Sequence, residues 1–202
     1  MKNAREYYRN MTGREYARPT LMRLLFSKSA DRTIIPILRN YSNLRVLELG
    51  CGAGRFTKEI CLKNIVKCVD VNPHLFTLDG IPVVKGDCRQ LSACLGAAEK
   101  FDRILSFFMT EYLTFEENRE LVRECRSYLK PDGELVFTFV NGFWGSLYVW
   151  GSRLVKGTGK HTCGLGAVRA IADYSGFDIA EVREIGRFGF RMSALVRMTP
   201  KT

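Results

Sequence analysis

The stretch that decides the fold is residues 46–57, VLELGCGAGRFT, an apolar run that leads into three alternating glycines and then a polar segment. Glycine lets the backbone turn sharply and lets a ligand lie against the main chain. A helix that starts after such a loop presents free N–H groups and the positive end of its dipole, which favour an anionic ligand group. The stretch therefore predicts a strand, a binding loop and a helix in that order.

The spacing of the glycines excludes two common nucleotide sites. Gly50, Gly52 and Gly54 follow the pattern G-x-G-x-G, whereas a dinucleotide fingerprint has GxGxxG and a P-loop ends in GK[ST]. Several kinds of nucleotide-binding enzyme share such a loop, so the residues that follow it must decide which class of ligand binds.

Two acids close the next two apolar runs. Asp70 stands twenty residues after Gly50, where a carboxylate can accept both ribose hydroxyls of an adenosine. Asp87 ends the third run, where it would meet an adenine amino group. Two structural alternatives stay open: Asp70 caps the turn before Pro73, and Asp87 caps the helix that follows it.

Apolar runs alternate with helical segments from Leu44 onward, a rhythm typical of parallel strands joined by crossover helices. The predicted strands are Leu44–Leu49, Ile65–Val71, Ile81–Val84, Phe101–Phe108 and Glu134–Val140. The predicted helices between them lie near Arg55–Leu62, Arg89–Ala97 and Phe115–Tyr128. A further helix at Leu165–Ser175 precedes two alternating segments joined by a glycine-bearing turn, which predict an antiparallel hairpin. The pattern predicts an α/β fold with seven strands.

At these residues the sequence resembles the class I S-adenosylmethionine-dependent methyltransferases. Residues 48–54 look like that family's first motif, Asp70 and Asp87 match its acids, and LKPDGEL at 129–135 is similar to its turn before the fifth strand. The resemblance covers residues 44–140 closely and 165–198 by topology. It implies a Rossmann-like, mostly parallel sheet with an antiparallel C-terminal hairpin and helices on both faces. It also implies S-adenosylmethionine as the methyl donor, S-adenosylhomocysteine as its product, and no metal.

The resemblance assigns parts of the cofactor to particular residues. The methionine carboxylate would lie on the glycine loop, the ribose on Asp70, and the adenine between Val71, Asp87 and Cys88. The implied cofactor-binding residues are Glu48, Gly50, Cys51, Gly52, Gly54, Asp70, Val71, Asp87, Cys88 and Phe107. For Glu48, a role in holding the loop is an equal alternative, and Phe107 has an alternative role in the core.

Methyl transfer from a sulfonium is an in-line displacement with a good leaving group, so an enzyme mainly aligns the nucleophile and excludes water. The fourth strand ends in SFFMTEYL, which is neither the NPPY nor the DPPY run of amino-directed adenine and glutamine methyltransferases. Many small-molecule members have a histidine where Tyr112 stands here. Glu111 and Tyr112 are the candidate catalytic residues, and whether the reaction needs a base stays open.

The predicted single domain, 1–202, has four parts: an N-terminal helical cap (1–43), a cofactor-binding core (44–140), an inserted substrate cap (141–164), and a C-terminal helix and hairpin (165–202). Pro19 and Pro36 are expected to break or start the leading helices. The inserted cap carries Phe143, Trp144, Leu147, Tyr148 and Trp150, followed by Arg153, Lys156 and Lys160. Three interpretations are open for these aromatics: a lid over a hydrophobic acceptor, an interfacial helix on anionic lipid, or core packing against the leading helices.

The net charge of +10 over 202 residues is uneven. Residues 1–43 carry nine basic and three acidic side chains and residues 141–202 nine and four, whereas residues 44–140 carry thirteen and fourteen. The basic flanks indicate a small-molecule or lipid-like acceptor, with anionic character, or a peripheral contact with an anionic membrane. The alternative is an RNA-directed methyltransferase or an RNA-binding protein that uses these flanks.

Composition bounds the class of protein. An apolar fraction of 46% excludes disorder. Seven cysteines without a CxxC pair argue against a disulfide framework or a zinc site, and no apolar run reaches the length of a membrane span. We therefore expect a cytoplasmic protein, of undetermined oligomeric state.

Overall fold

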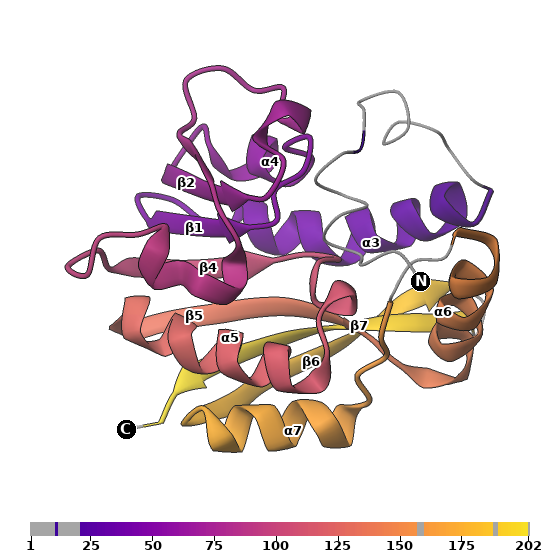
Figure 1. Ribbon diagram of the computed structural model, residues 1–202. Coiled ribbons are helices and arrows are strands. Elements are labelled where there is room, and N and C mark those ends of the chain that lie inside the picture. The colour runs from indigo at the N-terminus through magenta and orange to yellow at the C-terminus, as the bar shows by residue number, and fades with distance from the viewer. Residues whose placement is uncertain (1–10, 12–20, 157–159, 188–189, 202) are drawn as a thin grey trace.

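The sheet has seven strands in the order β3-β2-β1-β4-β5-β7-β6 (Figure 1). The computed structural model describes residues 11, 21–156, 160–187 and 190–201. The strands are β1 (Arg45–Leu49), β2 (Ile65–Asp70), β3 (Val83–Lys85), β4 (Phe101–Ser106), β5 (Leu129–Val140), β6 (Phe177–Arg187) and β7 (Phe190–Pro200). Neighbours among β1 to β5 pair in parallel, and β7 pairs antiparallel with both β5 and β6. The predicted fold class is confirmed.

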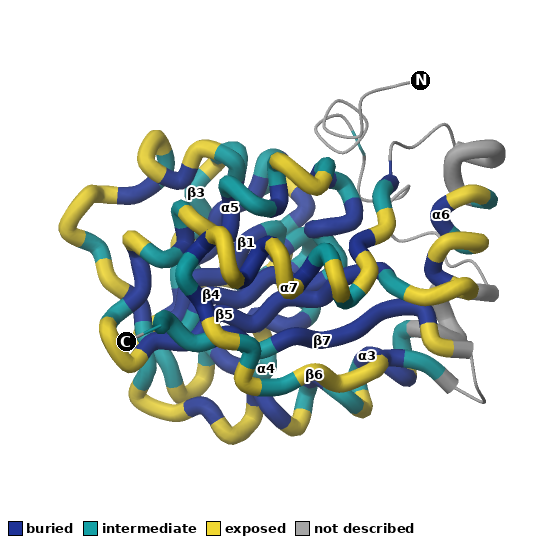
Figure 2. The backbone as a smooth tube through the Cα atoms, turned by 90° about the horizontal axis from the view of Figure 1, so that it is seen from below, coloured by how far each residue is buried: buried dark blue, intermediate teal, exposed yellow. Residues whose placement is uncertain are grey.

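Helices cover both faces of the sheet. They are α3 (Leu21–Arg39), α4 (Thr57–Ile60), α5 (Phe115–Tyr128), α6 (Gly142–Lys156) and α7 (Leu165–Tyr174), with the 3-10 segments η1 (Pro73–Leu75), η2 (Cys88–Ala93) and η3 (Thr110–Tyr112). Because side chains alternate along a strand, Val46 packs in the core under α3 and α4, whereas Leu47 packs in the core under α5 and α7. The central strands are buried between helices whose outer faces are exposed (Figure 2).

The order of the strands positions the site. From the central β1 the chain runs outward through β2 and β3, then crosses back to β4 and β5 on the other side. The connections leave β1 and β4 in opposite directions, so the carboxyl ends of these two strands form the switch point of the sheet. Ligands of open α/β sheets bind at such a switch point.

Pro36 lies inside α3, so the predicted break at this proline is wrong. A proline in a helix interior removes one hydrogen bond and crowds the preceding turn, at a cost of ~3 kcal/mol. Ile34 and Leu38 of the same helix are fully buried, and burial of each contributes ~1.5–3 kcal/mol, so packing offsets the proline. The predicted helix up to about Arg18 and the predicted break at Pro19 lie outside the described residues.

Two predicted helices are shorter in the structure. The predicted segment Arg55–Leu62 contains only α4, and the predicted Arg89–Ala97 is η2, in which Gln90 has the non-helical angles φ −138° and ψ 61°. The carboxylate of Glu124 on α5 accepts a hydrogen bond from the N–H of Leu91 at 3.1 Å. A tertiary contact thus satisfies a backbone donor that a regular helix would have paired.

The segment 141–164 contains a 15-residue helix, α6, at the end of the sheet where β5 ends and β7 begins (Figure 1). Four of its large apolar side chains are exposed: Phe143, Trp144, Leu147 and Trp150. The interpretation of these four as core residues is therefore wrong. Val149 and Gly145 face inward instead, with Gly145 against the backbone of β7. In the described part of the chain, no helix is both long and apolar enough to span a bilayer.

Candidate active site

The glycine loop after β1 uses backbone angles that other residues rarely adopt. Gly50, Gly52 and Gly54 have φ values of 74°, 53° and 82°. The N–H of Gly50 donates to the carbonyl of Val69 at 2.8 Å, which ties the loop to β2. A Cβ at Gly50 would lie 2.8 Å from Cγ of Met109, closer than atoms can approach. The loop therefore requires glycine both for its turn and for its contact with the segment after β4.

Asp70 ties the end of β2 to the same loop. Its Oδ2 accepts a hydrogen bond from the N–H of Gly52 and its Oδ1 one from the N–H of Asn72, each at 2.8 Å. The alternative of a turn cap is thus what the structure shows, and it is compatible with a ligand, since an ionised carboxylate offers about four lone-pair sites. The assignment of the ribose to Asp70 stays a prediction.

Glu48 lies beneath the loop and is buried. Its Oε2 accepts a hydrogen bond from the Thr57 hydroxyl at 2.6 Å, which joins β1 to α4. Burial raises the pKa of Glu48 to about 7; the bond from Thr57 opposes this shift and the charge of Asp70 adds to it. The role in loop architecture is present in the structure, while contact of Glu48 with the cofactor stays a prediction.

Cys51 and Cys88, two of the residues expected to line the cofactor, are buried. The pKa of Cys51 is raised by its hydrogen bond with Cys68 and by burial, and burial raises the pKa of Cys88 to about 12. Both are therefore neutral thiols, which do not act as nucleophiles. The sulfur of Cys88 lies 3.5 Å from that of Met109, the residue that also contacts Gly50. Sequence reasoning missed Met109, since methionine carries no chemical signature.

Asp87 acts as the cap of η2, one of the two alternatives open from the sequence. Its Oδ1 accepts a hydrogen bond from the N–H of Arg89 at 3.1 Å, and its Oδ2 pairs with the Arg89 guanidinium at 2.8 Å. Arg89 also pairs with Glu117 of α5. Val71, half-buried, follows β2 directly. Contact of Val71 and Asp87 with adenine stays a prediction.

The two phenylalanines after β4 lie beside the glycine loop. Phe107 is buried, and its ring centroid lies 4.8 Å from that of Phe56 in an edge-on arrangement. Phe108 has a φ of 57°, and its N–H donates to the Thr138 hydroxyl at 2.6 Å. Strained backbone of this kind clusters at functional sites. Phe107 belongs to the core under α3 and α4, so its predicted contact with the cofactor remains untested.

Glu111 and Tyr112 belong to a buried polar cluster with Tyr148 and Lys160, which we call the Glu111–Lys160 cluster. Glu111 is 6% exposed and Lys160 is 5% exposed. The Lys160 ammonium donates to Oε1 of Glu111 and, at 2.7 Å, to the Tyr148 hydroxyl. It also lies 4.8 Å and 4.5 Å from the ring centroids of Tyr112 and Tyr148, within range of cation–π attraction.

This cluster joins three parts of the chain. Glu111 and Tyr112 come from η3, Tyr148 from α6, and Lys160 from the segment before α7. The N–H of His161 donates to the carbonyl of Glu111 at 2.6 Å, which adds a backbone tie. Sequence reasoning placed Glu111 and Tyr112 correctly after β4 but did not find their pairing with Lys160. No local pattern could have found it, because the partners stand 49 residues apart.

The leading segment approaches the same edge of the sheet. The side-chain amide of Asn72 donates to the carbonyl of Met11 at 3.1 Å. The guanidinium of Arg55 donates to the carbonyl of Ser27 at 2.9 Å and pairs with Asp31 at 2.7 Å. The N-terminal region therefore borders the loop, as a cap over the site requires, although its role as a substrate cap stays a prediction.

The described residues fit the cofactor expected from the sequence. The glycine loop has no room for a Cβ, and it would bind a carboxylate of the ligand. Asp70 at the end of β2 and Asp87 after β3 suit a ribose and a purine. Glu48, Cys51 and Asp70 lie directly at the loop, and Cys88 reaches it through Met109. Among the described residues, no three His, Cys, Asp or Glu side chains gather as metal ligands.

Residues 47–137 match a family model described as "Methyltransferase domain". Two curated relatives are malonyl-[acyl-carrier protein] O-methyltransferases. The protein of Halalkalibacterium halodurans is 27% identical over an alignment of 105 positions, which covers 46% of this chain and 38% of the relative. The protein of Priestia megaterium is 27% identical over an alignment of 132 positions, which covers 59% of this chain and 46% of that relative. The chain thus spans less than half the length of these relatives.

Two solved structures have the same fold as this chain. The N-methyltransferase NodS of Bradyrhizobium japonicum, in complex with S-adenosylhomocysteine, gives a TM-score of 0.73 at 19% identity and covers 100% of both chains. Magnesium protoporphyrin IX methyltransferase of Synechocystis, also with S-adenosylhomocysteine, gives 0.72 at 16% identity and covers 98% of this chain and 93% of that one.

The residues that match the family model run from β1 to β5 and include the glycine loop and the switch point of the sheet. S-adenosylmethionine is the cofactor of this family, and the fold neighbours carry its product. Over residues 47–137 the chain thus matches the methyltransferase-domain family, and its described part has the fold of methyltransferases that bind S-adenosylmethionine or its product.

Proposed function

We propose that the chain transfers a methyl group from S-adenosylmethionine to a small-molecule or lipid-like acceptor. The observation that carries the proposal is the joining of the glycine loop to Asp70 at the switch point of the sheet, inside the residues that match the methyltransferase family. The cofactor, when bound, supplies a methyl group on a positively charged sulfur. The methyltransferase relatives do not favour the alternative of an RNA-directed enzyme or an RNA-binding protein.

The residues of the chain would bind the cofactor, orient the acceptor and enclose both. The N–H groups of the glycine loop and the Asp70 carboxylate would hold the two ends of the cofactor. Glu111 and Tyr112, just beyond β4, would line the acceptor side. The Glu111–Lys160 cluster fixes η3, α6 and the segment before α7 relative to one another, and such rigidity keeps a nucleophile aligned for displacement.

The acceptor we propose is small and anionic. The two curated relatives are named for an O-methyl transfer to a malonyl group, and the oxygen nucleophile of a malonyl group is a carboxylate. The excess of basic residues in both flanks of this chain favours such an acceptor. All seven cysteines are free thiols, which suits the reducing cytoplasm that we propose as its location.

Binding of S-adenosylmethionine tests the first part of the proposal. We expect saturable binding by isothermal titration calorimetry and at least a tenfold weaker affinity for Asp70→Asn, because the amide cannot serve two ribose hydroxyls as a carboxylate does. Asp178→Asn, at the exposed start of β6, is the matched control and should bind as the wild type does. A folded wild-type protein that binds no S-adenosylmethionine would contradict the proposal.

We further propose that α6 contacts an anionic membrane surface while the acceptor is taken up. Its exposed stripe of Phe143, Trp144, Leu147 and Trp150 repeats at helical spacing. The sequence continues the same helix with Arg153 and Lys156. Aromatic side chains prefer the headgroup region, and basic residues near the surface gain ~1 kcal/mol each from anionic lipid.

Tryptophan fluorescence tests the membrane contact directly. Both tryptophans of the chain, Trp144 and Trp150, lie on α6, so the emission reports this helix alone. We expect a blue shift with vesicles that contain phosphatidylglycerol and a much smaller one with pure phosphatidylcholine. The double variant Phe143→Ser with Leu147→Ser should lose the shift, whereas Leu62→Ser, which alters a 90% exposed leucine after α4, should keep it. Equal spectra with and without anionic vesicles would rule the contact out.

A further inference from the structure

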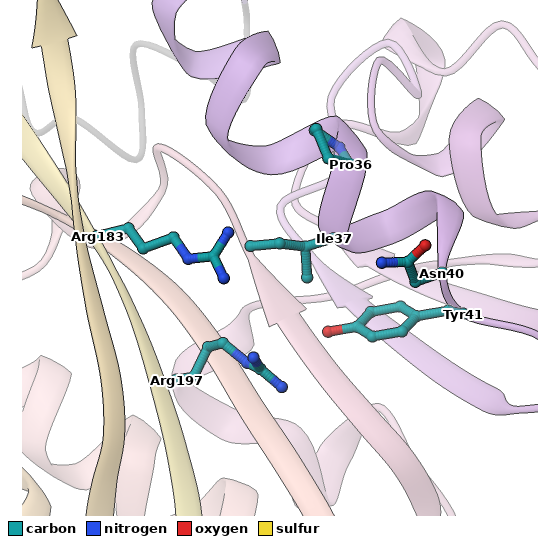
Figure 3. Close-up of a pocket in the computed structure, with 6 residues that line it drawn as sticks. All are labelled: Pro36, Ile37, Asn40, Tyr41, Arg183 and Arg197. Atoms are coloured by element: carbon teal, nitrogen blue, oxygen red, sulfur yellow. The ribbon is translucent and has the colours of Figure 1, made fainter.

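A small pocket lies between the end of α3 and the C-terminal hairpin (Figure 3). Its volume is about 170 Å³. The residues that line it are Pro36, Ile37, Asn40, Tyr41, Arg183 and Arg197. Four of these six carry hydrogen-bond donors, and two of the four are guanidinium groups, so the pocket is polar and basic.

This pocket and the glycine loop lie at opposite ends of the parallel strands. Tyr41 stands shortly before β1 begins, whereas the loop follows the end of β1. Arg197 of the antiparallel β7 stands opposite Val136 of β5, and its guanidinium reaches back to Glu134, nearer the start of that strand. Parallel strands all start at one end of the sheet and finish at the other, and the pocket belongs to the end where they start. It is separate from the candidate active site.

Carboxylates hold the two guanidinium groups through Nε of both arginines and Nη1 of Arg197. Glu181 accepts from Nε of Arg183 and, at 2.9 Å, from Nη1 of Arg197. Glu134 accepts from Nε of Arg197 at 2.7 Å. Within the described residues, neither terminal nitrogen of Arg183 donates a hydrogen bond, and the same holds for Nη2 of Arg197. Two positioned guanidinium groups therefore have unused donors beside the pocket.

The hydroxyl of Tyr41 is a third unused donor. The side chain is 8% exposed, and its hydroxyl has no hydrogen-bond partner among the described residues. In Figure 3 the hydroxyl points toward Arg197. Burial, together with the charge of Glu134, raises the pKa of Tyr41 to about 12, so the group keeps its proton at neutral pH. An orphaned buried hydroxyl costs free energy, and a ligand that accepts from it would recover that cost.

The charges near the pocket leave a positive excess. Arg183 and Arg197 line it, and Arg103 lies with its guanidinium 5.5 Å from the Tyr41 ring centroid. Against these three cations stand two carboxylates, Glu134 and Glu181. The carboxylates engage Nε of Arg183 and both Nε and Nη1 of Arg197, which leaves the two terminal nitrogens of Arg183 and Nη2 of Arg197 to bind a second acid. Guanidinium groups pair with carboxylates and phosphates through such parallel bonds.

We propose that this pocket binds a small oxyanion, such as inorganic phosphate or a short carboxylate, through Tyr41, Arg183 and Arg197. The volume admits an ion of that size and is too small for a nucleotide. The ion would bridge α3 to the hairpin, because Tyr41 follows α3 and the arginines come from β6 and β7. The proposal does not depend on the proposed methyl transfer, since the pocket lies at the other end of the parallel strands.

Calorimetric titration with inorganic phosphate at constant ionic strength tests the proposal, with acetate as a second arm that separates a phosphate site from a carboxylate site. We expect saturable one-to-one binding of at least one of the two ions. Arg183→Gln should weaken it at least tenfold, because the side chain supplies two unused nitrogens. Arg169→Gln, on an exposed turn of α7, is the charge-matched control and should bind as the wild type does.

Tyr41→Phe gives a readout that does not depend on the arginines. Without the ion, this variant should be at least as stable as the wild type, because it removes an orphaned hydroxyl. With the ion, it should lose part of the stabilisation that the wild type gains in thermal unfolding. The proposal is overturned if neither ion binds the folded wild type saturably, or if Arg183→Gln and Arg169→Gln bind equally well.

Discussion

Replacing Lys160 with methionine is expected to lower the free energy of unfolding by ~3–5 kcal/mol, the usual cost of removing one partner from a buried ion pair. The side chains of Lys160 and Glu111 are 6% and 7% exposed, so the variant leaves the carboxylate of Glu111 buried without its cation. The hydrogen bond from Lys160 to the Tyr148 hydroxyl is lost as well. Urea denaturation at neutral pH, followed by circular dichroism, measures the change.

Two further variants separate the missing cation from a simple loss of packing. Adding Glu111→Gln to Lys160→Met should restore much of the stability, because no charge is then left buried. Lys201→Met removes a cation whose partner Asp173 is 72% exposed, and pairs of that kind contribute at most ~1 kcal/mol. If Lys160→Met and Lys201→Met cost the same, the Glu111–Lys160 cluster does not hold the cap segments together.

The stability of the protein is expected to fall between pH 4.5 and pH 8 through the titration of Glu48. Burial raises the pKa of this carboxyl from 4.5 to about 7 in the folded chain. Between these two values the folded state binds one proton more than the unfolded state, so stability decreases as the pH rises. At 1.36 kcal/mol for each pKa unit, Glu48 contributes about 3 kcal/mol that is present below pH 4.5 and lost above pH 7.

Glu48→Gln isolates this contribution, because the amide oxygen can still accept from the Thr57 hydroxyl but does not titrate. Unfolding free energies of wild type and variant, measured by urea denaturation from pH 4.5 to 8, should diverge as the pH rises, with the variant the more stable above pH 7. Glu116→Gln, at an exposed position of α5, should give a constant difference across the range. Parallel curves for wild type and Glu48→Gln would mean that Glu48 is ionised in the folded protein throughout.

The α/β class and the position of the glycine loop could be predicted because the deciding signals are local. A glycine loop behind an apolar run, with an acid at the end of each of the next two runs, specifies strand ends regardless of the rest of the chain. Asp70 and Gly52 are separated by 18 residues, yet each is marked by its own neighbours. The number of seven strands follows from these marks and from the two alternating segments at the end of the chain, whereas the order of the strands comes from the structure.

What could not be predicted depends on contacts between distant segments. Pro36 continues a helix because the burial of its neighbours offsets the break. Lys160 belongs to a cluster with Glu111 only because α6 and the segment before α7 fold back over η3. The aromatic residues of 141–164 have the same hydrophobicity whether they face the core or the solvent, so composition alone could not decide between these outcomes.

Gly145 carries a consequence for the redesign of this protein. A Cβ at this position would lie 2.6 Å from the carbonyl oxygen of Met192 on β7, so the missing carbon atom sets the height of α6 above the sheet. Since α6 is a continuous helix, a side chain at position 145 would have to move this helix and β7 apart. Glycine at position 145 thus fixes how closely α6 can approach β7.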